Sequence, residues 1–261
     1  MTLISQSNWD VNYFIGPNTD LRLGFCDYKG TRVIYAASVP FIYVNYTAGF
    51  AFTDSLQSLS GNAQIRQIVG GFDIKATYDL YGGDYLYEHI WRFFEDGQFG
   101  SSIIIHGPGE ENNGQHTYHV PFRYDLDISG ASGDSFQQWL GTFFGFWANV
   151  AQEGQFISNP SLPAFFYDWQ VVDNATGKRA MVRARDGDNG EIWALQYSGL
   201  ESWSSWGGAQ SSAPGAPGSV PAIYDNNQSV QNTDVVLWYI SHIPSLNLVT
   251  GCGPSFRLVG F

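Results

Sequence analysis

Histidines are the residues of this sequence best suited to chemistry. His116 and His119 stand three positions apart, directly before an apolar segment at 120–128, and His242 lies near the end of the chain. Three neutral imidazoles with open coordination positions suit copper, zinc or iron. Two histidines three apart are, however, more often polar surface residues, and composition alone gives only a weak signal for a metal centre.

Two carboxylates form a second candidate site. Asp125 and Asp127 alternate with Leu126, so both carboxylates project from the same side of a strand. This arrangement suits a hard cation, or simply a solvated polar face. The sequence contains no nucleophile elbow, phosphate-binding loop or dinucleotide fingerprint. Cys26 and Cys252 could form a disulfide or remain as two buried thiols.

Composition limits the class of protein and its partners. The 261 residues are 44% hydrophobic and 16% aromatic, which excludes a disordered chain. The formal net charge of −12 argues against nucleic acid as a partner; it would attract metal ions or amines, or it simply serves solubility. No apolar run approaches the roughly 18–20 residues of a membrane span, so no membrane partner is expected. The first residues lack the features of a signal peptide, which leaves a cytoplasmic protein or one secreted after processing.

Short apolar segments between turn residues predict many β-strands. The predicted strands are 21–27, 31–36, 103–106, 120–128, 164–172, 179–185, 192–197 and 235–241. Their spacing favours one antiparallel sandwich or barrel domain over residues 1–261. Arg179, Arg183 and Arg185 stand at even spacing and should share one polar strand face.

One segment has a different period. Between Ser135 and Val150 the apolar residues follow helical spacing, with Ser135 as the N-cap, so a helix is predicted. It would be either a buried helix or the wall of an apolar substrate pocket.

The segment Val230–Tyr239 (VQNTDVVLWY), followed by Ser241-His242, resembles the catalytic domain of copper amine oxidases. The resemblance implies that His242 is the third copper ligand. His116–Gly130 (HTYHVPFRYDLDISG) is similar to the segment of that family which carries the first two ligands. His116 takes the first position and Tyr118 the second, and a β-bulge would let His119 replace the second ligand.

The family's cofactor is topaquinone, which forms from a tyrosine. Gly83–Gly97 resembles the motif around that tyrosine, which implies Tyr85 as the precursor. Continuing from a matching segment near the N-terminus, Tyr46 falls on the tyrosine that hydrogen-bonds the quinone. Asp54 is the nearest candidate for the base that takes the substrate proton.

The resemblance also implies a peripheral calcium site. The matching oxygen ligands are the carboxylates of Asp125, Asp127 and Asp234 and the backbone carbonyls of Leu126 and Val235.

Together these observations predict a mainly β protein, an antiparallel β-sandwich like the copper amine oxidase catalytic domain, with one or two short helices. The implied function is a copper-dependent oxidoreductase acting with O2 on a small apolar or aromatic molecule, amines included. One alternative is such a fold without quinone chemistry, whose aromatic pocket binds a metabolite or directs a non-redox cyclisation or isomerisation in biosynthesis. Another is a mononuclear copper oxygenase that keeps the three histidines. The partners expected are the substrate and O2, with a homodimer compatible with the resemblance.

Overall fold

A computed structural model of the chain describes residues 1–16, 20–46, 51–54, 62–80, 85–106, 116–142, 144–158, 162–163, 165–184, 190–198, 221, 224–244 and 251–261. These ranges contain 21 β-strands arranged in two antiparallel sheets. The predicted β-sandwich is confirmed. The one or two short helices are not found among the elements of the described ranges, and no helix there is long and apolar enough to cross a membrane.

The first sheet has β12 and β20 at its centre. Its main path runs in the order β1 (Thr2–Gln6), β2 (Trp9–Phe14), β3 (Arg22–Tyr28), β5 (Ala36–Ser38), β12 (His116–Leu126), β20 (Val235–Pro244), β18 (Glu191–Gln196) and β15 (Gly154–Ile157). Three strands join it outside this path: β4 (Thr31–Ile34) pairs with β3, and β6 (Ile42–Tyr46) pairs with β12 and with β7 (Ala51–Asp54).

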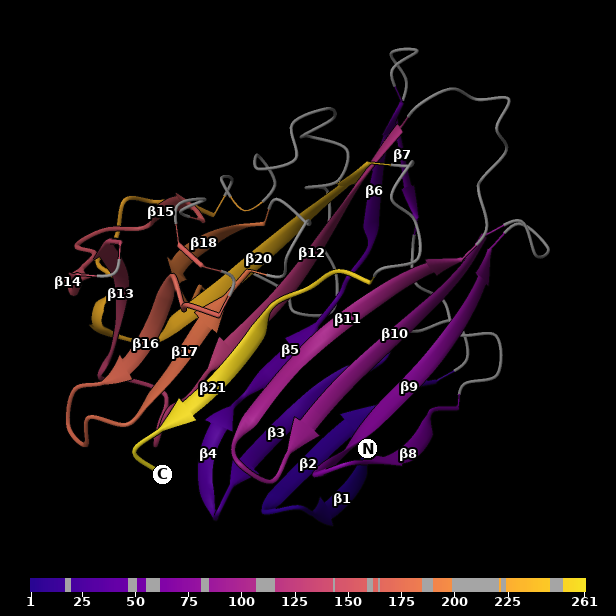
Figure 1. The fold of residues 1–261 in the computed structure, drawn as a ribbon, viewed down its shortest axis with the longest axis horizontal. Coiled ribbons are helices and arrows are strands. Elements are labelled where there is room, and N and C mark those ends of the chain that lie inside the picture. The colour runs from indigo at the N-terminus through magenta and orange to yellow at the C-terminus, as the bar shows by residue number, and fades with distance from the viewer. Residues whose placement is uncertain are drawn as a thin grey trace.

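The second sheet covers one face of the first (Figure 1). Its order is β14 (Gly145–Asn149), β13 (Asp134–Gly141), β16 (Trp169–Asp173), β17 (Arg179–Arg183), β21 (Ser255–Val259), β11 (Gln98–His106), β10 (Tyr85–Phe94), β9 (Gly71–Leu80) and β8 (Gln64–Ile68). A short strand, β19 (Gln231–Thr233), pairs with β13.

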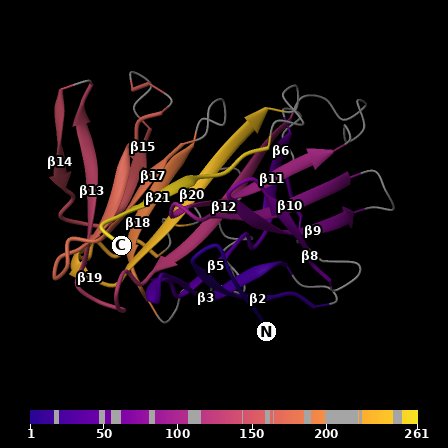
Figure 2. The ribbon, with the colours of Figure 1, turned by 60° about the horizontal axis from the view of Figure 1, so that its bottom comes forward.

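Aromatic side chains fill the space between the sheets. Figure 2 shows β2 and β3 of the first sheet lying beneath β9–β11 of the second. Trp9 of β2 contacts Phe93 of β10 with ring centroids 5.1 Å apart, and its Nε1–H donates to the Phe94 carbonyl at 2.8 Å. Buried and partly exposed residues alternate along β11, as expected for strands with one face in the core.

The segment predicted as a helix is a β-hairpin. β13 and β14 pair so that Trp139 lies opposite Trp147, with ring centroids 5.3 Å apart. Gly141, with φ of +124°, leads into the turn, and it lies opposite Gly145 at a backbone approach too close for a side chain. Aromatic residues pack well on a sheet, and glycine weakens a helix. Pairing with β16 therefore prevails over the helical spacing.

Both cysteines are buried free thiols, Cys26 in β3 and Cys252 beside β11. Buried and partly exposed residues alternate along β17. Arg179 and Arg183, two of the three arginines expected on one face, both lie on its partly exposed side. Arg185 lies outside the described residues.

Candidate functional site

His119 and His242 form a cross-strand pair at the centre of the first sheet. They are direct register partners of β12 and β20, so both side chains project from the same face. Their Nδ1 atoms lie 2.8 Å apart. The ring of His119 also contacts Tyr43 of β6, at 5.8 Å between centroids.

His116 lies on the other face of β12. Its Nε2 is 2.9 Å from the hydroxyl of Tyr118, and its ring contacts that of Tyr46 in a tilted arrangement, with centroids 4.8 Å apart. Tyr118 in turn contacts Tyr87 of the second sheet, which places this group between the sheets. The register of β12 against β6 and β20 runs without a shift from His116 to His119, so the expected bulge is absent. The structure therefore brings His119 and His242 together and leaves His116 apart.

A carboxylate completes the histidine pair. Glu191 of β18 places Oε2 3.6 Å from His242 Nε2, and it accepts hydrogen bonds from Gln155 and from Trp193 Nε1. Burial by itself raises the pKa of Glu191, but these donors and His242 outweigh it and lower the pKa overall. Sequence reasoning missed Glu191, because only the pairing of β18 with β20 brings it to the histidines.

The carboxylate favours one direction for the hydrogen bond between the two imidazoles. An ionised Glu191, 3.6 Å from His242 Nε2, favours a proton on that nitrogen, and His242 Nδ1 is then left with a lone pair. In this arrangement His119 donates from Nδ1 and keeps a lone pair on Nε2. That Nε2 is buried and has no hydrogen-bond partner. Burial and the neighbouring His242 lower the pKa of His119 to about 3, against the opposing effect of Glu191, so the imidazole is neutral.

The Glu191–His242–His119 chain can therefore accept a proton, or hold a metal through a lone pair, at His119 Nε2. It opens toward solvent on the side of His242, whose side chain is 20% exposed.

For Tyr85 and Asp54, the predicted quinone precursor and base, the structure describes the backbone alone. Tyr85 begins β10 of the second sheet, opposite Leu80, and Asp54 ends β7 of the first, opposite Ile42. Their side chains lie outside the described residues. Tyr46 is placed beside His116, as given above.

The acidic site does assemble. Carboxylate oxygens of Asp125, Asp127 and Asp234 lie within 4.8 Å of one another. Leu126 and Val235, whose carbonyls the resemblance assigns to calcium, are direct register partners. Burial raises the pKa of Asp127, although the charge of Arg32 opposes it.

Asp134 adds a fourth carboxyl that the sequence did not indicate. Burial and the charges of Asp173, Asp127 and Asp234 raise its pKa to about 8, while a hydrogen bond from the Ile128 backbone opposes this. Its Oδ1 is buried without a hydrogen-bond partner. Four converging carboxyl groups, one of them with an unpartnered buried oxygen, fit a hard cation, whose charge would favour the ionised form of Asp134.

Comparison with known proteins places the fold. No family model matches the sequence, and no curated protein matches it. Among solved structures, Aspergillus nidulans amine oxidase matches with a TM-score of 0.68 at 13% identity, covering 99% of this chain and 51% of that one. The fold is that of copper amine oxidases.

Two further amine oxidase structures match over 99% of this chain. A copper-containing benzylamine oxidase from Hansenula polymorpha gives a TM-score of 0.70 at 11% identity, with 59% of that chain covered. Pichia pastoris lysyl oxidase gives 0.65 at 11% identity, with 52% covered. The chain thus spans little more than half the length of these amine oxidases, and at such identities the likeness concerns the fold.

Proposed function

We propose that this protein is an enzyme with the copper amine oxidase fold that performs acid–base chemistry without a quinone. The observation that supports this proposal is the Glu191–His242–His119 chain, which ends in a buried, unpartnered lone pair. The substrate proposed is a small apolar or aromatic molecule, and the reaction class is a proton transfer leading to isomerisation or cyclisation. Such a reaction needs no oxidant.

Each residue of the chain has one task in this proposal. His119 Nε2 takes a proton from the substrate while the Nδ1 proton of His119 passes to His242 Nδ1, and the reverse transfer later returns it. The positive charge then comes to rest on the partly exposed His242, because the low pKa of His119 makes a buried imidazolium there unfavourable. Glu191 orients the His242 ring and stabilises this positive charge.

Copper-dependent oxidation with O2 is the second candidate. It is favoured by the fold likeness, which includes a copper-containing benzylamine oxidase, and by the paired Nδ1 atoms of His119 and His242. The described residues do not fit a three-histidine centre, because His116 faces the space between the sheets. Copper at the pair alone, with O2 as the oxidant, is the form of this candidate that the geometry allows.

One experiment separates the two candidates. The purified protein is loaded with Cu²⁺ in air, and bound metal and intact mass are then measured. Copper bound with a mass gain at Tyr85 would support amine oxidation by a quinone. Copper without that gain would support a copper oxygenase, and either result would overturn the acid–base proposal.

A second measurement tests the acid–base proposal directly. Nitrogen-15 NMR of the histidine rings at neutral pH should show His119 protonated on Nδ1 only and His242 on Nε2 only. Glu191→Gln should remove the preference of His242 for a proton on Nε2. The protonation pattern of His106, on the second sheet, should stay unchanged. The opposite tautomer at His119 in the wild-type protein would contradict the proposal, because Nε2 would then carry a proton.

We also propose that a calcium ion occupies the acidic site, with Asp125, Asp127 and Asp234 as carboxylate ligands and the carbonyls of Leu126 and Val235 beside them. The mutual approach of the three carboxylates and the buried Oδ1 of Asp134 support this assignment. Its role would be structural.

A further inference from the structure

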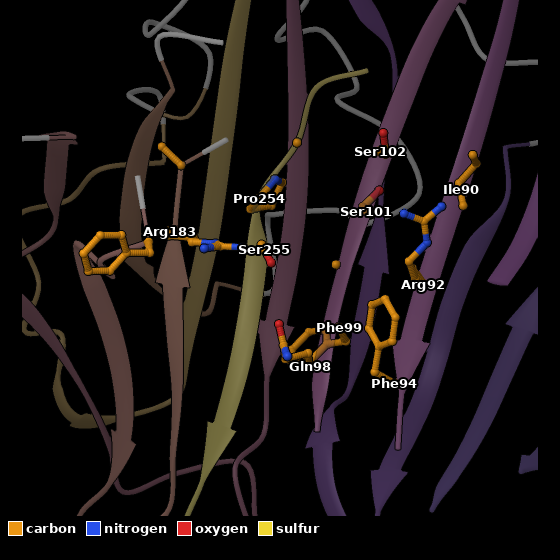
Figure 3. A pocket seen from close by; sticks show the side chains of 14 residues that line it. Ile90, Arg92, Phe94, Gln98, Phe99, Ser101, Ser102, Arg183, Pro254 and Ser255 are labelled. Atoms are coloured by element: carbon orange, nitrogen blue, oxygen red, sulfur yellow. The ribbon is translucent and has the colours of Figure 1, made fainter. Parts of the chain in front are cut away.

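The second sheet carries a cavity on the face that points away from the first sheet. Its volume is about 540 Å³. Arg92 of β10 lines it, while the neighbouring Trp91 and Phe93 are buried in the core on the opposite face of the same strand. Figure 3 shows Arg92 and Arg183 entering the cavity from opposite sides, with Ser255 between them.

Four strands place the two arginines in one row. Arg183 of β17 is the register partner of Ser255 in β21, Ser255 pairs with Gly100 in β11, and Gly100 pairs with Arg92 in β10. Three strand spacings of about 4.8 Å separate the arginine backbones by roughly 14 Å. The floor between them is low, because Ser255 is small and Gly100 has no room for a side chain: a Cβ there would lie 2.6 Å from the Pro254 carbonyl.

The charge of this cavity is opposite to that of the protein. The chain carries 24 acidic against 12 basic residues, yet among the residues that the structure describes the lining of this cavity includes two arginines and no Asp or Glu. Asp73, the register partner of Arg92 in β9, lies 3.6 Å from its guanidinium, but it already accepts two 2.8 Å hydrogen bonds from Arg66. Arg92 Nε is buried and has no hydrogen-bond partner. The row therefore suits an anion.

An aromatic cavity adjoins the arginine row. Its volume is about 630 Å³, and it shares Phe165 with the first cavity. The other aromatic side chains that line it are Trp139, Trp147, Phe166 and Tyr167. The guanidinium of Arg183 lies over the Tyr167 ring, 5.7 Å from its centroid, and so borders both cavities.

We propose that the two adjoining cavities together form a groove that binds a small aromatic carboxylate. The carboxylate lies between Arg92 and Arg183, over Gly100 and Ser255, and the ring of the ligand lies against Phe165 toward the two tryptophans. Arginine pairs with carboxylates through two parallel hydrogen bonds, which makes it the side chain of choice for such an anion. The site lies on the second sheet and shares no residue with the Glu191–His242–His119 chain, so it stands independently of the function proposed above.

Indole-3-acetate and its neutral analogue indole-3-acetamide are the probes that test this site. Isothermal titration calorimetry with the wild-type protein should show at least tenfold tighter binding of the acetate, because the amide cannot form the ion pairs. Equal affinity for the two probes, or no binding of either, would overturn the proposal without any variant having to fold.

Two substitutions then locate the site. Arg92→Gln and Arg183→Gln should each weaken indole-3-acetate binding about tenfold or more, with little effect on the amide. Arg179→Gln is the matched control, since Arg179 lies on the same face of β17 but outside both cavities. A loss in the control as large as that in Arg183→Gln would show general charge attraction and refute the specific site.

Discussion

His89 and His119 are two buried imidazoles in different surroundings. Burial lowers the pKa of each to about 3. His89 lies in the core, where its Nε2 is 3.0 Å from the Ser101 hydroxyl and its ring packs on Trp91. His119 lies on the far face of the first sheet, next to a second imidazole and a carboxylate. His89 therefore serves packing, whereas His119 has the partners that acid–base chemistry requires.

The buried state of His89 predicts a loss of stability in mild acid. Its pKa is about 6.5 in the unfolded chain and about 3 in the folded protein, so only the unfolded chain binds the proton between these values. Stability is thus fully present above pH 6.5 and falls as the pH decreases. One such histidine costs about 2 kcal/mol between pH 7 and 5.

Urea denaturation of the wild-type protein and of His89→Gln at pH 7, 6 and 5 measures this effect. The variant should be less stable at pH 7 but should lose less stability on acidification. If the free energy of unfolding fell equally with pH in both proteins, His89 would be protonated as readily in the folded protein as in the unfolded chain, which would contradict this prediction.

β12 decides which side chains can meet. It pairs with β5, β6 and β20, and its regular register turns successive residues to opposite faces. His116 and Tyr118 consequently face the core, and His119 faces away from it. Ile243 is the register partner of Tyr118, so it lies on the same face as His116.

This alternation predicts where three imidazoles could be assembled. Tyr118→His combined with Ile243→His should place them with His116 on the core side of β12, where they can bind one Cu²⁺. The background is His119→Gln and His242→Gln, so that copper at the pair does not contribute. Electron paramagnetic resonance should then show a copper centre with three nitrogen ligands.

The control carries the same number of histidines in another arrangement. Thr117→His with Ile243→His, in the same background, puts one imidazole on the opposite face of β12. It should bind copper far more weakly. A three-nitrogen signal of equal strength in the control would contradict the assignment of faces.

At the scale of the whole molecule, the acidic site marks the place where the chain changes sheets. β12 of the first sheet leads through Asp127 to β13 of the second, and Asp234 separates β19 of the second sheet from β20 of the first. Asp134 begins β13 at the same place. A cation here would join both crossings and offset part of the net charge of −12.

Calcium should therefore stabilise the folded protein as a whole. At a concentration one hundred times its Kd, Ca²⁺ adds about 2.7 kcal/mol to the free energy of unfolding. Thermal denaturation with CaCl2 and with a chelator should show a higher midpoint in calcium. Asp127→Asn should abolish this shift, whereas Asp10→Asn, an equal charge change at an exposed position of β2, should retain it. No shift in the wild-type protein would refute the calcium assignment.

The sequence alone was sufficient to predict features that depend on the alternation of residues within one strand. Alternation and turn residues predicted most of the strands that they covered, such as 192–197, which forms β18 with a shift of one residue. Asp125 and Asp127 were predictable as a pair because residues two apart in a strand share a face. The hairpin of β13 and β14 was missed, because two paired strands joined at Gly141 and Gly145 present aromatic residues at intervals that imitate a helix.

Tertiary structure decided everything that depends on register between distant strands. Glu191 meets His242 only because β18 lies beside β20, and Arg92 faces Arg183 only through two intervening strands. Local sequence sets which residues of a strand share a face. Which strands lie next to that face depends on the packing of the whole core, because many distant segments bury their apolar surface there together.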